Sequence, residues 1–158
     1  MGGFGGVLKN QSIGVASAAG KAYIHSAGKT QDVSKVWSNL GEQDAFLESM
    51  AASAQAVADY FGDKILYINV MNNLSIDCDC DAHPHDPEMK DIGILASLDP
   101  VALDQACLDL VHAVRPSEGN NSKPLIERIK SRNGQHTVDH AERIGMGSKK
   151  YELVELQL

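Results

Sequence analysis

The sequence predicts an α/β fold: a single compact domain in which a mixed sheet is covered by helices. Its 158 residues suit one domain of ordinary size, and a hydrophobic content of 43% is enough for a sizeable core. Segments that read as short strands are separated by segments with helical periodicity, which is the alternation that builds layered α/β domains. We therefore expect residues 1–158 to form one domain.

The first half of the chain contains one clear helix followed by a strand. Between residues 44 and 61, apolar side chains recur at steps of three and four, which gives a helix one buried stripe, and Gly62 follows as a stop signal. Residues 64–71 (KILYINVM) are rich in β-branched and aromatic residues and contain no breaker, as in a mostly buried strand. Ahead of both, the glycine-rich residues 2–6 (GGFGG) predict a flexible loop.

The second half begins with another short strand and a longer helix. Residues 92–96 (IGILA) are typical of a buried strand. Asp99 as N-cap and Pro100 in the first turn predict the start of a helix, which should end before Pro116. Two short helices, the second capped by Thr137, and a last strand are then expected at residues 122–131, 137–144 and 151–156.

The composition excludes several classes of partner. A net charge of −7 argues against nucleic acid or an anionic membrane as the main partner, because both select for clustered Lys and Arg. No apolar run approaches the ~20 residues of a membrane helix and no secretory signal is visible, so we expect a cytoplasmic protein without a membrane partner. The chain has three cysteines, an odd number, and Cys78 and Cys80 are too close in the sequence for an unstrained disulfide. We therefore expect these cysteines to be metal ligands or reactive thiols rather than disulfide partners.

The strongest chemical signal is the segment 77–86 (DCDCDAHPHD), which gathers two thiols, two imidazoles and four carboxylates. Thiolate and imidazole are ligands that zinc, iron(II) and nickel prefer, whereas calcium and magnesium prefer oxygen. We therefore predict a transition-metal site whose candidate ligands are Cys78, Cys80, His83 and His85. Carboxylates that would complete the shell or orient the imidazoles are Asp77, Asp81 and Asp86.

The spacing leaves the rest of the coordination shell open. Ligands separated by one residue lie too far apart along an extended backbone to close a shell unaided, so a turn at residues 82–84 and further ligands are needed. Another subunit could supply them, and the candidates within the chain are His25, His112, His136 and His140. Two other interpretations remain: a solvated acidic loop with buried cysteines, and a thiol nucleophile with a histidine as base. The neighbouring carboxylates oppose the nucleophile because they raise a thiol pKa.

Several other positions have simpler explanations than a site. The glycine loop followed by Lys9 and Asn10 could cradle an anion, but it matches no phosphate-binding fingerprint, and a flexible turn is the better interpretation. Capping explains Asp99. Cys107 lies on the apolar stripe of its helix, where a core role is favoured. Asp104 is less easily explained in this way.

Four stretches of the sequence together resemble one family. They read GGFGGVLKN, GKAYIHS, CDCDAHPHDPEMKDIGILASLDPVALDQACLDLV and HAERIGMGSKKYELVEL, and they are similar to the DUF362 family, whose function is undefined. The resemblance runs over nearly the whole chain and is looser between residues 29 and 63. Besides the two cysteines of the loop, it draws attention to the family-pattern positions Lys9, Asn10, His25, Asp91, Asp99, Asp104 and His140.

Family members are often described as iron–sulfur centre proteins because many carry a ferredoxin-like insert with two four-cysteine runs. This sequence has three cysteines and no such insert, so we expect no four-cysteine iron–sulfur cluster within the chain. The resemblance also implies that family members are longer and that this chain corresponds to their C-terminal part. An exposed edge or face would then bind a missing N-terminal half or a second copy of the chain.

These observations lead to three functional hypotheses. The first is a metal-binding α/β protein of undefined activity, with zinc, iron or nickel held by residues 77–86. The second is a non-catalytic interaction module that docks to a missing N-terminal half or to another subunit. The third is a thiol-based redox protein. No residue pattern in the sequence specifies a reaction.

Overall fold

The computed structural model describes residues 5–77 and 81–156 and confirms the α/β class. Within this part of the chain, no helix combines the length and the apolar character needed to cross a bilayer. The helices and strands, in chain order, are α1 (Val7–Lys9), the π-helical turn η1 (Asn10–Gly14), α2 (Ala18–His25), the 3₁₀ turn η2 (Val33–Ser38), α3 (Gln43–Phe61), β1 (Tyr67–Met71), β2 (Gly93–Ser97), α4 (Pro100–Ala113), α5 (Lys123–Ser131) and α6 (Gln135–Arg143).

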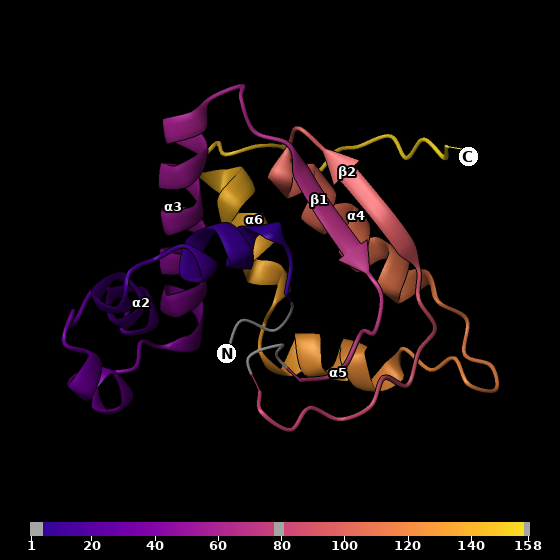
Figure 1. Cartoon of the computed structure of the whole chain (residues 1–158), viewed down its shortest axis with the longest axis horizontal. Helices are drawn as coiled ribbons and strands as arrows, with labels where there is room; N and C mark the ends of the chain where they lie inside the picture. Colours follow the sequence, from indigo (N-terminus) through magenta and orange to yellow (C-terminus); the bar gives the residue numbers. More distant parts are fainter. Residues whose placement is uncertain (1–4, 78–80, 157–158) are drawn as a thin grey trace.

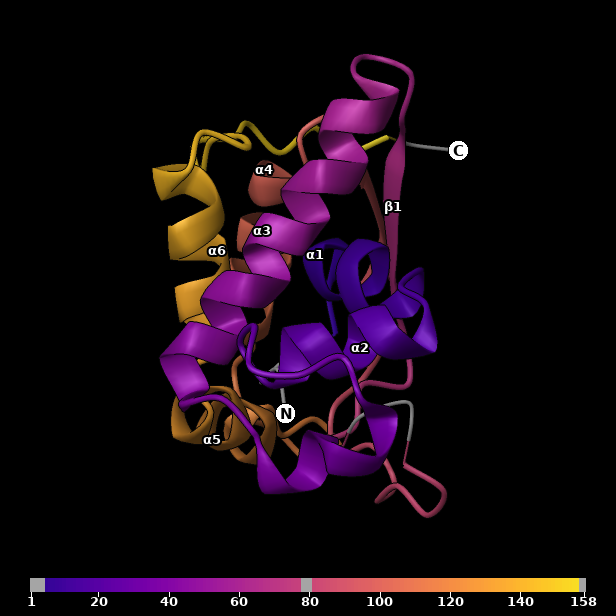
Figure 2. The same cartoon turned by 90° about the vertical axis from the view of Figure 1, so that its left-hand side faces the viewer.

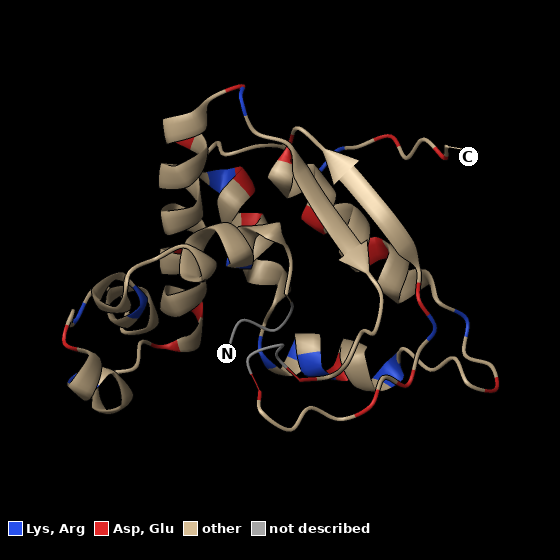
Figure 3. Ribbon diagram, viewed as in Figure 1, with Lys and Arg blue, Asp and Glu red and all other residues tan. Residues whose placement is uncertain are grey.

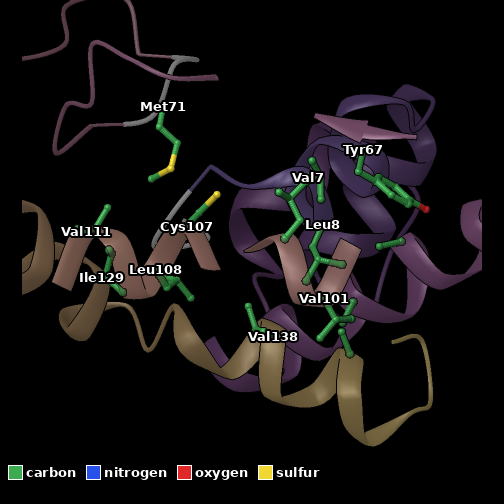
Figure 4. Close-up of a cluster of buried hydrophobic side chains, with 14 residues drawn as sticks. Val7, Leu8, Tyr67, Met71, Val101, Cys107, Leu108, Val111, Ile129 and Val138 are labelled. Atoms are coloured by element: carbon green, nitrogen blue, oxygen red, sulfur yellow. The ribbon is translucent and has the colours of Figure 1, made fainter. Parts of the chain in front are cut away.

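Helix α4 lies at the centre of the molecule (Figure 1). It packs against β1 and β2 on one side and against α1 and α6 on others. Helix α3 runs along α6 and also contacts α1, so that it covers the core from the side opposite the strands (Figure 2). The space between these elements is filled by apolar side chains, of which Leu8, Val101, Leu108 and Val138 are almost wholly buried (Figure 4). Their burial supplies the main driving force for the fold.

Helices α3 and α4 form where the apolar periodicity predicts them. Leu47 and Met50 of α3 are buried on the expected stripe, and the helix ends at Gly62, which has a positive φ of 58° that favours glycine. Helix α4 begins as expected, because the Asp99 side chain accepts hydrogen bonds from the first free N–H groups, and Pro100 occupies the first turn. These two helices are the frame on which the other elements pack.

The two strands differ from the expected buried strands. Strand β1 pairs with β2 in antiparallel register, with Tyr67 opposite Ser97. One face of this sheet covers α4, whereas Ile68, Val70 and Ile94 point the other way and are 53%, 55% and 70% exposed. The prediction of burial was therefore wrong for this outer face, because in the described part of the chain no layer of helices covers it.

Two elements near the C-terminus also differ from expectation. Residues 151–156 form neither helix nor strand, so the predicted last strand was wrong and the sheet in the described residues is the β1–β2 pair. Helix α6 begins at Gln135, ahead of Thr137, which was expected as the N-cap but is fully buried within the helix. The earlier start places His136 and His140 on one helix, a turn apart.

Candidate functional site

An open cleft of about 880 Å³ lies beside the C-terminal end of β1. Its walls come from the segment that follows β1, from α1, η1 and α2, and from α4 and α5. Although the chain carries a net charge of −7, basic side chains outnumber acidic ones among the described residues that line the cleft. They are Lys9, Lys21, His25, Arg128 and Arg132, against Asp77 and Asp81. A concave and locally basic surface of this kind suits an anionic small molecule.

At the rim of the cleft, Asp77 holds the imidazole of His85. Oxygen Oδ2 of Asp77 lies 2.6 Å from His85 Nδ1 and also accepts the backbone N–H of His85 at 3.0 Å. The Asp77 side chain is 15% exposed, whereas that of His85 is 74% exposed. Arg128 of α5 approaches Oδ1 of the same carboxylate at 3.6 Å, and Ser75 Oγ donates to the His85 carbonyl oxygen. The carboxylate therefore fixes the orientation of a histidine that faces solvent.

These contacts shift the pKa values of both partners. Hydrogen bonds from His85, first from its backbone and then from its ring, lower the pKa of the Asp77 carboxyl. The hydrogen bond to Asp77 raises the pKa of the His85 imidazole. With the Nδ1 proton directed at the carboxylate, Nε2 is the nitrogen that a neutral His85 presents to a ligand.

The remaining residues of the predicted metal loop are only partly placed. Cys78 and Cys80 lie outside the described residues, so their role as ligands stays a prediction. His83 is exposed, and its backbone N–H donates to Asp81 Oδ1 at 3.0 Å. Asp86 is exposed as well. The loop thus brings one carboxylate and one imidazole into direct side-chain contact and directs a second carboxylate to the cleft.

Of the four distant histidines considered as additional ligands, His25 lies on the same cleft. Its ring stacks on Phe46, with centroids 5.2 Å apart, and its Nδ1 lies 2.7 Å from a backbone carbonyl oxygen of α2. His112 is exposed at the end of α4. His136 and His140 lie instead at the contact between α6 and α3. His25 is therefore the distant histidine best placed to approach residues 77–86.

Asp104, a family-pattern position, has a structural role. Its buried carboxylate accepts the N–H groups of Val7 and Leu8 at 2.9 and 3.0 Å and the Nδ2 of Asn69 at 2.9 Å. A side chain at Gly6 would collide with this carboxylate, so the glycine permits the close approach. Burial raises the pKa of Asp104 to about 6, because the hydrogen bonds offset only part of the lost hydration. The N–H groups considered as an anion cradle are thus occupied by an internal carboxylate.

The two other family-pattern aspartates also bind the backbone. Asp99 caps α4 and in addition accepts the N–H of Ser148 at 2.8 Å, so it ties the segment after α6 to the start of α4. Gly147 packs directly against this carboxylate. Asp91 accepts the N–H of Asn73 at 2.8 Å and joins the two ends of the segment that connects β1 to β2. Both residues therefore have a structural role.

Cys107 is buried in the main core, as its place on the apolar stripe predicts. Its sulfur accepts a hydrogen bond from Asn69 Nδ2 at 3.3 Å. Burial raises the pKa of this thiol to about 11, which keeps it protonated at neutral pH and unsuited to nucleophilic attack.

The sequence alone did not predict the roles of several residues. Arg128 and Arg132 lie four residues apart, a spacing that places them on one side of α5 and its end, but only the packing of α5 directs them to the cleft. Asn69 lies on β1 and links Asp104 to Cys107. Glu48 of α3 faces two histidines of α6, a contact between segments almost ninety residues apart.

Comparison with known proteins identifies the family. The family model described as a domain of unknown function, DUF362, matches residues 1–109. No curated protein and no solved structure matches the chain. The matched region contains the glycine loop, residues 77–86 and most of α4, whereas α5 and α6 follow it. The chain therefore belongs to the DUF362 family.

Proposed function

We propose that this protein binds a transition-metal ion, namely zinc, iron or nickel, through residues 77–86, beside a cleft that takes an anionic ligand. The observation that carries the proposal is the 2.6 Å contact between His85 Nδ1 and Asp77 Oδ2. A carboxylate on one nitrogen of an imidazole is the usual support of a metal-binding histidine, because it holds the ring and leaves Nε2 as the ligand atom. It also makes that nitrogen more basic.

The rest of the ligand set comes from the neighbouring sequence. Cys78 directly follows Asp77, and Cys80 lies two residues further on. Both supply thiolates, which favour zinc, iron or nickel over calcium and magnesium. A bound cation would also offset the repulsion among the carboxylates of residues 77–86. Because Asp77 and Asp81 line the cleft, such an ion would lie near the basic side chains on its other walls. An anionic ligand could then contact the ion and these side chains together.

Metal content tests the first half of the proposal. Elemental mass spectrometry on protein purified without a histidine tag or chelator should find about one equivalent less metal in Cys78→Ser/Cys80→Ser than in the parent, and equal metal contents would refute the proposal. Asp77→Asn should weaken metal binding by about 10–100-fold, the usual cost of losing such a supporting group. His112→Gln, which changes an exposed histidine on α4, is the matched control and should retain the metal. Absence of metal after reconstitution under reducing conditions would refute the proposal, and rapid thiol labelling would then favour the redox hypothesis.

Ligand-induced stabilisation tests the second half. Phosphate and succinate should raise the thermal midpoint of the metal-loaded protein, because a ligand that binds only the folded state stabilises it. Arg128→Gln should abolish the shift, since this side chain lines the cleft. Lys130→Gln removes an exposed charge from the same helix and should leave the shift unchanged. Equal shifts in all three proteins would show that the anions act elsewhere.

A second candidate function is an interaction module, in which the outer face of the sheet binds a second copy of the chain. Strands β1 and β2 carry no charged residue (Figure 3), and Ile68, Val70 and Ile94 lie exposed on their outer face. Adjacent exposed apolar side chains of this kind mark interaction surfaces. This candidate predicts a dimer in sedimentation equilibrium that Ile68→Thr/Ile94→Thr converts to a monomer. As a control, Tyr60→Ser removes an exposed aromatic side chain at the end of α3 and should leave the dimer intact. A monomeric parent protein would exclude this candidate function.

A further inference from the structure

A second group of potential metal ligands lies at the contact between α3 and α6. Glu48 extends from α3, and His136 and His140 extend from α6. Because residues four apart lie on one face of a helix, both imidazoles face α3. Their ring centroids are 6.3 Å apart. None of the three is among the described residues that line the cleft, so this group is separate from the site proposed above.

The distances between the donor atoms approach those of a metal site. Glu48 Oε1 lies 3.0 Å from His136 Nε2 and 3.4 Å from His140 Nδ1. Each of the three residues offers one potential ligand atom, and these atoms all lie within 4.8 Å of one another. In a tetrahedral site with bonds of about 2.0–2.1 Å, neighbouring ligand atoms are about 3.3–3.4 Å apart. Two edges of such a ligand triangle are therefore already close to the required length.

Hydrogen bonding does not account for the whole group. His140 Nδ1 is buried and has no hydrogen-bond partner in the described part of the chain, although Glu48 Oε1 lies 3.4 Å away. Buried polar atoms without a partner are rare in native proteins, and an ion that binds them is one established explanation.

Arg143 places a positive charge beside Glu48. Its Nη1 lies 3.7 Å from Glu48 Oε1, and its side chain is 61% exposed. Exposed ion pairs are weak, so this guanidinium can turn into solvent when another cation arrives. A metal ion and Arg143 should therefore compete for the same carboxylate.

We propose that Glu48, His136 and His140 form a metal site for a borderline divalent cation such as zinc, cobalt(II), nickel or iron(II), with one position open to water. Two imidazoles and one carboxylate are the protein ligands of known catalytic zinc and non-haem iron sites. Glu48 is 38% exposed, which leaves the solvent side of the group accessible. The family match ends at residue 109, so the site combines a residue inside the matched region with two beyond it.

Cobalt(II) titration of the metal-free protein tests this site. In the Cys78→Ser/Cys80→Ser background, one equivalent of cobalt should still bind, and its spectrum should show ligand-field bands without thiolate charge-transfer bands. Adding His140→Gln or Glu48→Gln should weaken this binding by more than about 100-fold, since loss of a mere supporting group costs about 10–100-fold. Adding His112→Gln, the exposed control, should leave the affinity unchanged. Adding Arg143→Gln should strengthen binding severalfold, because it removes the competing cation.

Each outcome tests the Glu48–His136–His140 site independently of the metal site proposed at residues 77–86. Failure of the double cysteine variant to bind cobalt, or equal affinity after Glu48→Gln, would overturn the proposal and leave a hydrogen-bonded helix contact. Unchanged or weaker binding after Arg143→Gln would refute the competition for Glu48. Circular dichroism and urea unfolding of each metal-free variant verify the fold. Glu48→Gln, at the most exposed of the three ligands, keeps the test valid if a histidine variant does not fold.

Discussion

Asp104→Asn perturbs the buried contact between α4 and the N-terminal turn. The carboxylate accepts hydrogen bonds from the N–H groups of Val7 and Leu8 and from Asn69 Nδ2. Asparagine has the same shape but one accepting oxygen, so its NH₂ group would face one of these three donors. A buried donor left without an acceptor costs about 1–3 kcal/mol. Both oxygens of a protonated carboxyl can still accept a hydrogen bond, whereas an amide nitrogen cannot, so we expect Asp104→Asn to destabilise the fold at low pH.

The cost of this substitution should depend on pH. Burial raises the pKa of Asp104 from its ordinary 3.8 to about 6. Between these values the folded protein binds more protons than the unfolded chain, so the native contribution of Asp104 to stability falls as pH rises from about 4 to about 6. A shift of about two pKa units corresponds to about 3 kcal/mol. Asparagine does not titrate, so the variant escapes this loss and should match or exceed the parent at pH 8.

Urea unfolding of both proteins between pH 4 and pH 8 measures this difference. The free energy of unfolding of Asp104→Asn, relative to the parent, should rise by about 3 kcal/mol over this range, with most of the change between pH 4 and pH 6. Asp59→Asn replaces an exposed aspartate on α3 and should show no such trend. A difference between Asp104→Asn and the parent that stays constant with pH would refute the account of Asp104 as a carboxyl whose pKa is raised by burial.

Three further substitutions test the packing. Gly147→Ala should lower the free energy of unfolding by about 1–3 kcal/mol in urea titrations, because the added methyl collides with the Asp99 carboxylate, whereas Gly14→Ala, which has space, should be near neutral. Leu108→Ala should cost about 2–5 kcal/mol by the same measurement, since this side chain fills the core. Ile94→Thr should change stability by less than about 0.5 kcal/mol in thermal unfolding, and a large loss would mean that the outer face of the sheet is covered.

Elements whose signals are local agree with the structure. Helix α3 follows from the apolar stripe between residues 44 and 61 and from Gly62 at its end. The start of α4 follows from Asp99 and Pro100, because capping depends only on neighbouring residues. Such local patterns predict structure well, because the contacts on which they depend lie within a few residues of one another.

Elements that depend on distant partners do not follow from the sequence in this way. The apolar runs around Ile68 and Ile94 predict strands correctly, but a run of this kind is equally compatible with one or two covered faces, and the number of layers is a property of the whole fold. Thr137 has the side chain of an N-cap, yet it is buried inside α6 because Gln135 and His136 precede it in the helix. The Glu48–His136–His140 group depends on that helix start and on the packing of α6 against α3, neither of which local propensity reveals.

The hydrogen bonds of the three family-pattern aspartates make them poor candidates for metal ligands. Asp99 and Asp104 accept N–H groups at both carboxylate oxygens, and Asp91 accepts one N–H group at Oδ1. A carboxylate engaged in this way is costly to redirect, because its donors would be left without an acceptor. Asp77 differs, since one of its partners is the imidazole of His85, which itself can bind an ion. Among the aspartates that the sequence singles out, it is therefore Asp77 whose contacts fit the support of a metal ligand.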